Sequence, residues 1–161
     1  MKKITIKKLK LSDIKLIFNL YNSIVNDGFS TTKKKISYEK HKVWFLNSFR
    51  SKNVKIFICH YGSKKIGYLR FNKLDQISAK ISIVIKEAFR GKGIASILLY
   101  KSTKIAFKND RINQIYAEVL KKNHQSIKFF LNNGYKMIKF KNKFKNIFKR
   151  NNYIFLKKIN K

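Results

Sequence analysis

Apolar residues recur along this chain at two spacings, and they divide it into alternating strands and helices. Runs in which every second residue is apolar are typical of half-buried strands, whereas apolar residues three and four apart line one face of a helix. No linker, internal repeat or low-complexity segment interrupts the series, so we expect one α/β domain spanning residues 1–161. The predicted strands cover residues 4–9, 54–61, 66–72, 79–85, 114–119, 135–141 and 152–158, and the predicted helices cover residues 14–21, 38–49, 95–107 and 123–133.

Turn and cap residues mark several of these boundaries. Ser12 or Asp13 can cap the first helix and Ser37 the second, because their side-chain oxygens accept hydrogen bonds from unpaired backbone amides. Gly62-Ser63-Lys64-Lys65 separates two strand-like runs and predicts a hairpin. Gly134 is expected to end the last helix, since glycine readily adopts the left-handed conformation found at helix ends.

The segment Arg90-Gly91-Lys92-Gly93-Ile94-Ala95 joins a predicted strand to a predicted helix and carries the first chemical signal. The first N–H groups of a helix lack intrahelical acceptors, and the helix dipole favours negative charge at that end. Gly91 and Gly93 have no Cβ, so an anionic group can approach the main chain closely. This corner is therefore a candidate phosphate-binding site. Two glycines before a helix can also form an ordinary turn, and the segment fits neither the P-loop nor the dinucleotide-binding pattern.

A second motif follows one predicted strand later, in the segment from Asn123 to Tyr135. Together the two segments resemble the GCN5-related N-acetyltransferase (GNAT) superfamily, over residues 4–158. The family's acetyl-CoA signature Arg/Gln-x-x-Gly-x-Gly/Ala is matched by Arg90, Gly93 and Ala95. Its pattern Asn-x-x-Ala/Ser-x-x-aromatic/Leu-Tyr-x-x-x-Gly-Phe/Tyr is matched by Asn123, Ser126, Phe129, Gly134 and Tyr135. The resemblance implies a mixed, mostly antiparallel sheet of six to seven strands with about four helices, splayed at an acetyl-CoA site.

The resemblance also implies which residues bind acetyl-CoA as co-substrate, with no metal. Backbone groups of Ile83, Val84 and Ile85 would pair with the pantetheine arm, and one N–H would face the thioester oxygen, where a fixed donor stabilises the developing oxyanion. Asn123 would reach the pantetheine or a water, or would simply cap its helix. The Arg90 side chain would suit the pyrophosphate or would cap the turn. The complete predicted cofactor-binding set is Ile83, Val84, Ile85, Arg90, Gly91, Lys92, Gly93, Ile94, Ala95, Asn123 and Ser126.

One position departs from the family pattern. Where members often have a tyrosine that donates a proton to the leaving thiolate, this chain has Phe130, which cannot donate. A thiol with a pKa near 8.5 leaves tolerably well without full protonation, so the reaction would be slower rather than abolished. Tyr135 or a water are the candidates to replace the missing acid. His41 and Glu118 are the candidate bases for the attacking amine, although Glu118 could instead pair with a lysine.

The acceptor is suggested by residues 37–45. They resemble a Ser-x-Glu-x-His-x-x-Trp-Phe pattern of GNAT members that acetylate amino sugars on nucleotide carriers. His41 and Trp44 lie three residues apart and share a helix face, where a ring and an imidazole would suit a sugar nucleotide. The alternative is a core tryptophan and a surface histidine. We therefore expect a small-molecule amine acceptor, with the amino group of a nucleotide-linked amino sugar in surface glycan synthesis as first choice and a protein N-terminal amine, such as that of a ribosomal protein, as second.

A formal net charge of +32 opens a non-enzymatic alternative, a basic nucleic-acid-binding module whose glycine turn is structural. Only Arg50, Arg70, Arg90, Arg111 and Arg150 are arginines, and scattered lysines are weaker phosphate readers. The segment 139–150 interleaves aromatic and basic residues as single-strand binders do, or it forms a hairpin with apolar residues inward. We expect the charge to be compositional, with no nucleic-acid or membrane partner, although its field would raise the local concentration of an anionic cofactor or substrate at low salt. Cys59 is the single cysteine and is expected as a buried strand residue, which suits a reducing cytoplasm. The basic start Met1-Lys2-Lys3 has no apolar core directly behind it, so we expect no secretory signal. We therefore expect a cytoplasmic protein, either a monomer or a homodimer.

Overall fold

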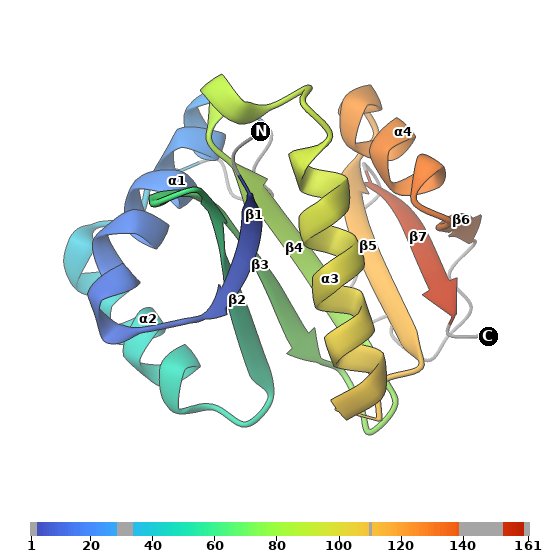
Figure 1. Ribbon diagram of the computed structural model, residues 1–161, viewed down its shortest axis with the longest axis horizontal. Helices are drawn as coiled ribbons and strands as arrows, with labels where there is room; N and C mark the ends of the chain where they lie inside the picture. Colours follow the sequence, from blue (N-terminus) through green and yellow to red (C-terminus); the bar gives the residue numbers. More distant parts are fainter. Residues whose placement is uncertain (1–2, 29–33, 110, 139–152, 160–161) are drawn as a thin grey trace.

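The computed structural model describes residues 3–28, 34–109, 111–138 and 153–159. Seven strands form one sheet in the order β1-β2-β3-β4-β5-β7-β6, and helices cover both of its faces (Figure 1). All neighbouring strands are antiparallel except β4 and β5, which are parallel. The elements are β1 (Ile4–Lys8), a 3-10 turn (Leu11–Asp13), α1 (Ile14–Asn26), α2 (Tyr38–Arg50), β2 (Val54–Tyr61), β3 (Lys64–Lys73), β4 (Ser78–Ile85), a second 3-10 turn (Glu87–Phe89), α3 (Ile94–Asn109), β5 (Gln114–Leu120), α4 (His124–Asn132), β6 (Lys136–Ile138) and β7 (Tyr153–Ile159). The expected mixed, mostly antiparallel architecture is confirmed.

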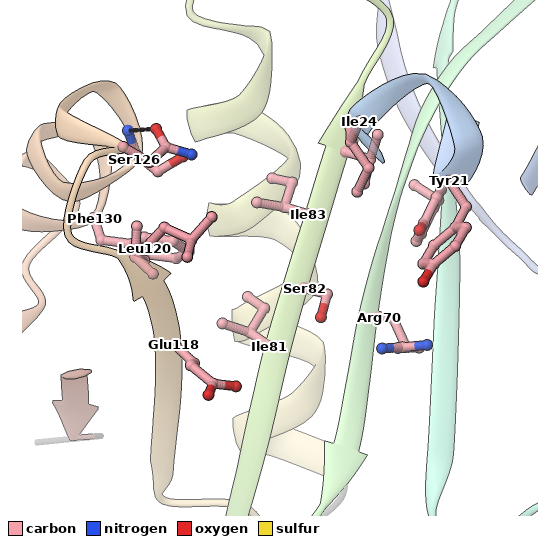
Figure 2. Close-up of a pocket in the computed structure, with 14 residues that line it drawn as sticks. Tyr21, Ile24, Arg70, Ile81, Ser82, Ile83, Glu118, Leu120, Ser126 and Phe130 are labelled. Carbon is pink, nitrogen blue, oxygen red and sulfur yellow. Dashed lines mark hydrogen bonds between the residues drawn. The ribbon is translucent and has the colours of Figure 1, made fainter. Parts of the chain in front are cut away.

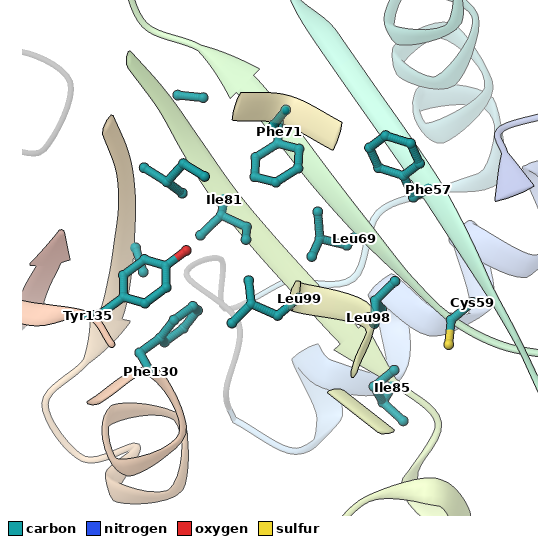
Figure 3. Packing of buried hydrophobic residues seen from close by; sticks show 14 of the residues in the cluster. Phe57, Cys59, Leu69, Phe71, Ile81, Ile85, Leu98, Leu99, Phe130 and Tyr135 are labelled. Carbon is teal, nitrogen blue, oxygen red and sulfur yellow. The ribbon is translucent and has the colours of Figure 1, made fainter. Parts of the chain in front are cut away.

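Two hydrophobic cores hold the layers together. On one face, α3 and α4 pack on the sheet through Leu98, Leu99 and Phe130, among others (Figure 3). On the other face, Ile17 of α1 and Phe45 of α2, both fully buried, pack on side chains from β2, β3 and β4. This second cluster has fewer buried residues than the first.

The boundaries were predicted well, with three corrections. The first helix, expected over residues 14–21, continues to Asn26. The hairpin turn between β2 and β3 contains only Gly62 and Ser63, because β3 already begins at Lys64. Asp13 does not cap α1 with its side chain. Its buried carboxylate instead accepts hydrogen bonds from the Lys10 N–H at 2.8 Å and Lys65 Nζ at 2.6 Å.

Other expected boundary features are present. The Ser37 hydroxyl caps α2 by accepting the Lys40 N–H. Cys59 is a buried strand residue, and burial raises the pKa of its thiol to about 11. The predicted connection over residues 139–150, with the adjoining ends of the closing strands, lies outside the described residues. None of the described helices combines the length and apolar character needed to cross a bilayer.

The sheet opens between β4 and β5. Their pairing starts at Ser78 and Gln114 and ends at Ile81 and Ala117, although both strands continue. Backbone polar groups alternate sides along a strand, and the Lys86 N–H donates to the Ile66 carbonyl of β3. The backbone groups of Val84 therefore face β3, whereas those of Ile83 and Ile85 face the opening.

Candidate active site

The corner between β4 and α3 leaves its backbone amides unused. Gly91 and Gly93 both have left-handed backbones, with φ of 73° and 71°, a conformation that costs other residues about 1–2 kcal/mol. Within the described part of the chain, no acceptor pairs with the N–H groups of residues 91–95. A Cβ built on either glycine would meet no atom within 4 Å, so the space above this corner is open.

A cavity of about 510 Å³ opens over these amides. Ile83 and Ile85 of β4 form one wall, and Ser126 and Phe129 of α4 form another. Of the predicted cofactor-binding residues, the cavity lining includes Ile83, Ile85, Arg90, Gly91, Gly93, Ile94, Ala95 and Ser126. It also includes Gln125 and Lys128, which sequence reasoning missed because neither belongs to the matched motif.

The Arg90 side chain holds the corner in place. Its Nε donates to the Ile85 carbonyl at 3.0 Å, and its Nη2 donates to Asp27 at the end of α1 at 2.9 Å. Of the two roles considered for this side chain, the structure thus favours the structural one. Lys92 Nζ is likewise occupied, by the Ala88 carbonyl at 3.0 Å. Within the described residues, the donors that remain unpaired at this corner are therefore the main-chain amides.

Asn123 is the N-cap of α4, which is one of the two roles predicted for it. Its Oδ1 accepts the Ser126 N–H at 3.0 Å. The residue also lines a second cavity, and no described residue pairs with its Nδ2. The cap thus leaves the amide donor available to a ligand, and the two roles are compatible.

The second cavity, of about 150 Å³, lies on the other side of the opening in the sheet. Tyr21 of α1 and Arg70 of β3 bound it on one side, and Glu118 and Phe130 on the other (Figure 2). Ile83 and Ser126 line both cavities. The two cavities therefore meet where β4 separates from β5.

Polar side chains from three neighbouring strands lie side by side in this second cavity. Arg70 is paired with Ser82 in the β3–β4 register, and Ser82 and Glu118 directly follow the last β4–β5 pair. Because successive side chains alternate faces, all three point to the face covered by α1 and α2, as Figure 2 shows. Glu118 is an ion-pair partner of Lys80, and its buried Oε1 has no hydrogen-bond partner within the described ranges.

His41 and Trp44, the predicted acceptor-binding pair, do not line either cavity. His41 is 1% exposed; its Nε2 hydrogen-bonds to the Ile14 carbonyl at 3.1 Å, and its ring packs against Phe18, Trp44 and Phe45. The surface position considered for this histidine is wrong, because α2 turns it toward α1. Trp44 is only partly buried, and its ring lies 5.2 Å from the Arg70 guanidinium carbon. Trp44 thus touches a residue that does line the second cavity.

Tyr135 does not take the place of the missing tyrosine. Phe130 lines the second cavity, but Tyr135 is 2% exposed and lies in the core under α3, edge-on to Phe130 at 4.9 Å between ring centroids (Figure 3). Burial raises the pKa of the Tyr135 phenol, which makes it a poorer proton donor. Tyr135 therefore belongs to the core rather than to the candidate site.

Comparison with known proteins defines the class. Residues 17–135 match the acetyltransferase (GNAT) family, so the chain belongs to that family and is an N-acetyltransferase of the kind that uses acetyl-CoA. Acetyltransferase PseH of Campylobacter jejuni is 27% identical over 128 residues, which is 80% of each protein.

Solved structures of acetyltransferases share the fold. C. jejuni PseH in complex with acetyl coenzyme A superposes with a TM-score of 0.72 at 20% identity, covering 99% of this chain and 100% of that one. The ribosomal-protein-alanine N-acetyltransferase of Brucella melitensis gives a TM-score of 0.78 at 17% identity, covering 97% and 99%. These likenesses establish the GNAT fold.

Proposed function

We propose that the chain acetylates the amino group of a nucleotide-linked amino sugar, with acetyl-CoA bound over the glycine corner. The observation that carries this proposal is the meeting of two cavities at Ile83 and Ser126. One cavity has free amides suited to a diphosphate, and the other has polar side chains suited to an amine. A donor and an acceptor can thus approach one point from opposite faces of the sheet.

The main chain supplies most of the acetyl-CoA site. The amides of residues 91–95 would bind the diphosphate. The groups of Ile83 and the N–H of Ile85 would pair with the pantetheine arm along the open side of β4, whereas Val84, which faces β3, is withdrawn from the predicted set. An N–H on this edge would also stabilise the oxyanion that forms when an amine attacks the thioester. Asn123 Nδ2 is a further donor at the same opening.

Glu118 is our candidate for the proton acceptor. An alkylammonium cannot attack until it loses a proton. The Oε1 of Glu118 is an unpaired carboxylate oxygen in the second cavity, which we call the acceptor cavity. We expect Glu118→Gln to lower kcat by about 10²-fold or more, the usual contribution of a positioned base. Acetyl-CoA affinity should not change. A steady-state assay with near-normal kcat at every pH would contradict this role.

The acceptor class follows from charge and from residues 37–45. A chain of net charge +32 attracts anions and repels polycations such as the N-terminal regions of ribosomal proteins. A nucleotide-linked sugar carries the favourable sign. The similarity of residues 37–45 to members that act on such sugars supports the same choice, although Trp44 would act there through Arg70 rather than by direct contact.

Calorimetry with acetyl-CoA tests the first half of the proposal. Micromolar binding is expected for the wild-type protein, as is common for enzyme substrates. Gly93→Trp places an indole in the open space over the amides and should abolish binding. Gly62→Ala is the control, because it also substitutes a left-handed glycine, with φ of 61°, but lies in the β2–β3 turn. If Gly93→Trp binds acetyl-CoA normally, the predicted site is wrong.

An acceptor panel tests the second half. Purified enzyme is supplied with acetyl-CoA and one acceptor at a time. Nucleotide-linked amino sugars are compared with peptides that have free N-termini, and the rate is measured as release of the CoA thiol. Higher kcat/KM for the nucleotide sugars supports the proposal, and preference for the peptides overturns it. Salt-dependent binding to DNA or RNA without any acetyl-CoA affinity would favour the nucleic-acid module instead.

A further inference from the structure

Arg70 occupies an unusual position for an arginine. It lies in the middle of β3, between buried Leu69 and Phe71, with Ile56 and Ser82 as its neighbours in the sheet. Its side chain projects into the acceptor cavity rather than into bulk solvent (Figure 2). Burying part of a guanidinium is unfavourable unless an anion compensates it.

No carboxylate neutralises this guanidinium within the described ranges. The ion pairs found there join Asp13 to Lys65, Glu118 to Lys80 and Asp27 to Arg90. Arg70 Nε is buried and lacks a hydrogen-bond acceptor. An unused charged donor at the wall of a cavity is what an anionic ligand group would satisfy.

Trp44 fixes the orientation of this arginine. Its indole, presented by α2, lies 5.2 Å from the guanidinium carbon, within the range of a cation–π contact. A guanidinium held against a ring keeps its edge free for two parallel hydrogen bonds to a phosphate. The His41 ring supports Trp44 in turn, with 5.4 Å between centroids.

The separation of Arg70 from Glu118 sets the size of the acceptor. They lie on β3 and β5, on either side of Ser82 in β4, so their backbones are at least two strand spacings, roughly 10 Å, apart. With side chains reaching inward, the span suits a molecule whose amine and anion are separated by about the width of a sugar ring.

We propose that Arg70, positioned by Trp44, is the specificity-determining residue that binds the phosphoryl group of the nucleotide carrier while the amine lies toward Glu118. This inference rests on the proposed function and names the residue that would distinguish a carrier-linked amino sugar from a free one. Arg70 does no chemistry in this scheme. It acts on acceptor binding, and Trp44 is a positioning residue.

Kinetics with matched acceptors test the inference. The wild-type enzyme and Arg70→Gln are assayed with a nucleotide-linked amino sugar, the same sugar without phosphate, and an amine of similar length that carries a carboxylate. We expect Arg70→Gln to raise the KM of the nucleotide-linked sugar by about ten- to a hundredfold, the effect of losing a charge-assisted hydrogen bond. The KM of the free sugar and all kcat values should change little. Arg50→Gln, at the exposed end of α2, is the matched control.

Three results with Arg70→Gln would overturn the inference. The KM of the nucleotide-linked sugar could be unchanged, the KM of the free sugar could rise by the same factor, or the KM could rise only for the carboxylate-bearing amine. Calorimetric acetyl-CoA affinity separates this failure from failure of the proposed function, because Arg70→Gln should bind acetyl-CoA as the wild-type protein does. If the wild-type protein binds no acetyl-CoA, the proposed function has failed instead.

Trp44 variants test the positioning role. Trp44→Leu removes the aromatic face and should raise the KM of the nucleotide-linked sugar several-fold, since cation–π contacts contribute modestly. Trp44→Phe should restore most of the affinity. A purely structural role would lower thermal stability in Trp44→Leu without this KM effect and without rescue by phenylalanine, and that result would contradict the assignment.

Discussion

The His41 imidazole fills a space between α1 and α2 in which it is 1% exposed. Burial lowers its pKa because the charged ring would lose its hydration, and the hydrogen bond to the Ile14 carbonyl opposes this effect only in part. As pH falls, the unfolded chain therefore takes up a proton near pH 6.5, before the folded protein does. Stability contributed by neutral His41 is complete above that pH and is lost as the pH decreases toward the folded pKa.

We expect the free energy of unfolding of the wild-type protein to fall by up to about 1.4 kcal/mol per pH unit for this histidine below pH 6.5. Burial also lowers the pKa of His60, with help from Lys7 and Lys65, so that residue adds to the same trend. Urea unfolding from about pH 5 to about pH 8 measures the effect. His41→Gln should flatten the profile, whereas His124→Gln, at an exposed site, should not.

The same variant separates packing from catalysis. If His41 only holds α1 against α2, His41→Gln keeps wild-type kcat at pH 7.5 under conditions in which the variant remains folded. A large fall in kcat for the folded variant would restore His41 as a candidate base or acceptor-binding residue.

Among the elements, β3 and β4 fit together so tightly that one methyl group would disturb the candidate site. A Cβ on Gly67 would lie 2.4 Å from the Val84 carbonyl oxygen and 2.6 Å from Ile85 Cδ1. Real atoms cannot approach that closely, so β4 would have to move, and it carries the residues that border the opening in the sheet. Gly67→Ala would therefore act on the proposed acetyl-CoA site from β3, a strand that does not line the cavity over the glycine corner.

We expect Gly67→Ala to lower stability by about 1–3 kcal/mol, as overpacking does, and to weaken acetyl-CoA binding several-fold. Gly62→Ala, in the turn before the same strand, should lose a similar amount of stability through backbone strain while keeping its acetyl-CoA affinity. Thermal unfolding measures the stability of both variants, and calorimetry measures their acetyl-CoA affinity. Equal affinities in the two variants would show that the β4 backbone does not hold the cofactor.

The strands and helices were predictable because each rests on local periodicity and on cap or turn residues such as Ser37 and Gly134. The glycine corner was predictable for the same reason, since a strand, two glycines and a helix start adjoin in sequence. Arg70 and Ser82 were not, because they come together with Glu118 only through the strand order and register of the sheet. A lone arginine in an apolar strand was the one signal. The position of His41 could be predicted only in part. Its helical spacing predicts that it lies beside Trp44, but which side of α2 packs against α1 depends on the tertiary fold.

At the scale of the whole molecule, the chain has a net charge of +32, whereas the proposed acetyl-CoA site offers neutral backbone amides. The Arg90 and Lys92 side chains at the corner are already occupied. The lysines would therefore act at a distance, by raising the concentration of an anionic substrate near the surface, and not as contacts in the bound state. Such an effect depends on the screening length, whereas short hydrogen bonds inside a cavity depend on it much less.

Steady-state kinetics at increasing salt test this division of roles. Between about 20 mM and about 500 mM KCl the screening length falls from roughly 20 Å to roughly 4 Å, so the KM of acetyl-CoA should rise several-fold while kcat stays constant. Dephospho-acetyl-CoA, which lacks the 3′-phosphate, should show a smaller increase because it carries less charge. A KM that is independent of salt for both substrates would mean that the lysines contribute nothing to substrate capture. A change in kcat would mean that charged side chains take part in the bound complex, contrary to the proposed binding of acetyl-CoA by main-chain amides.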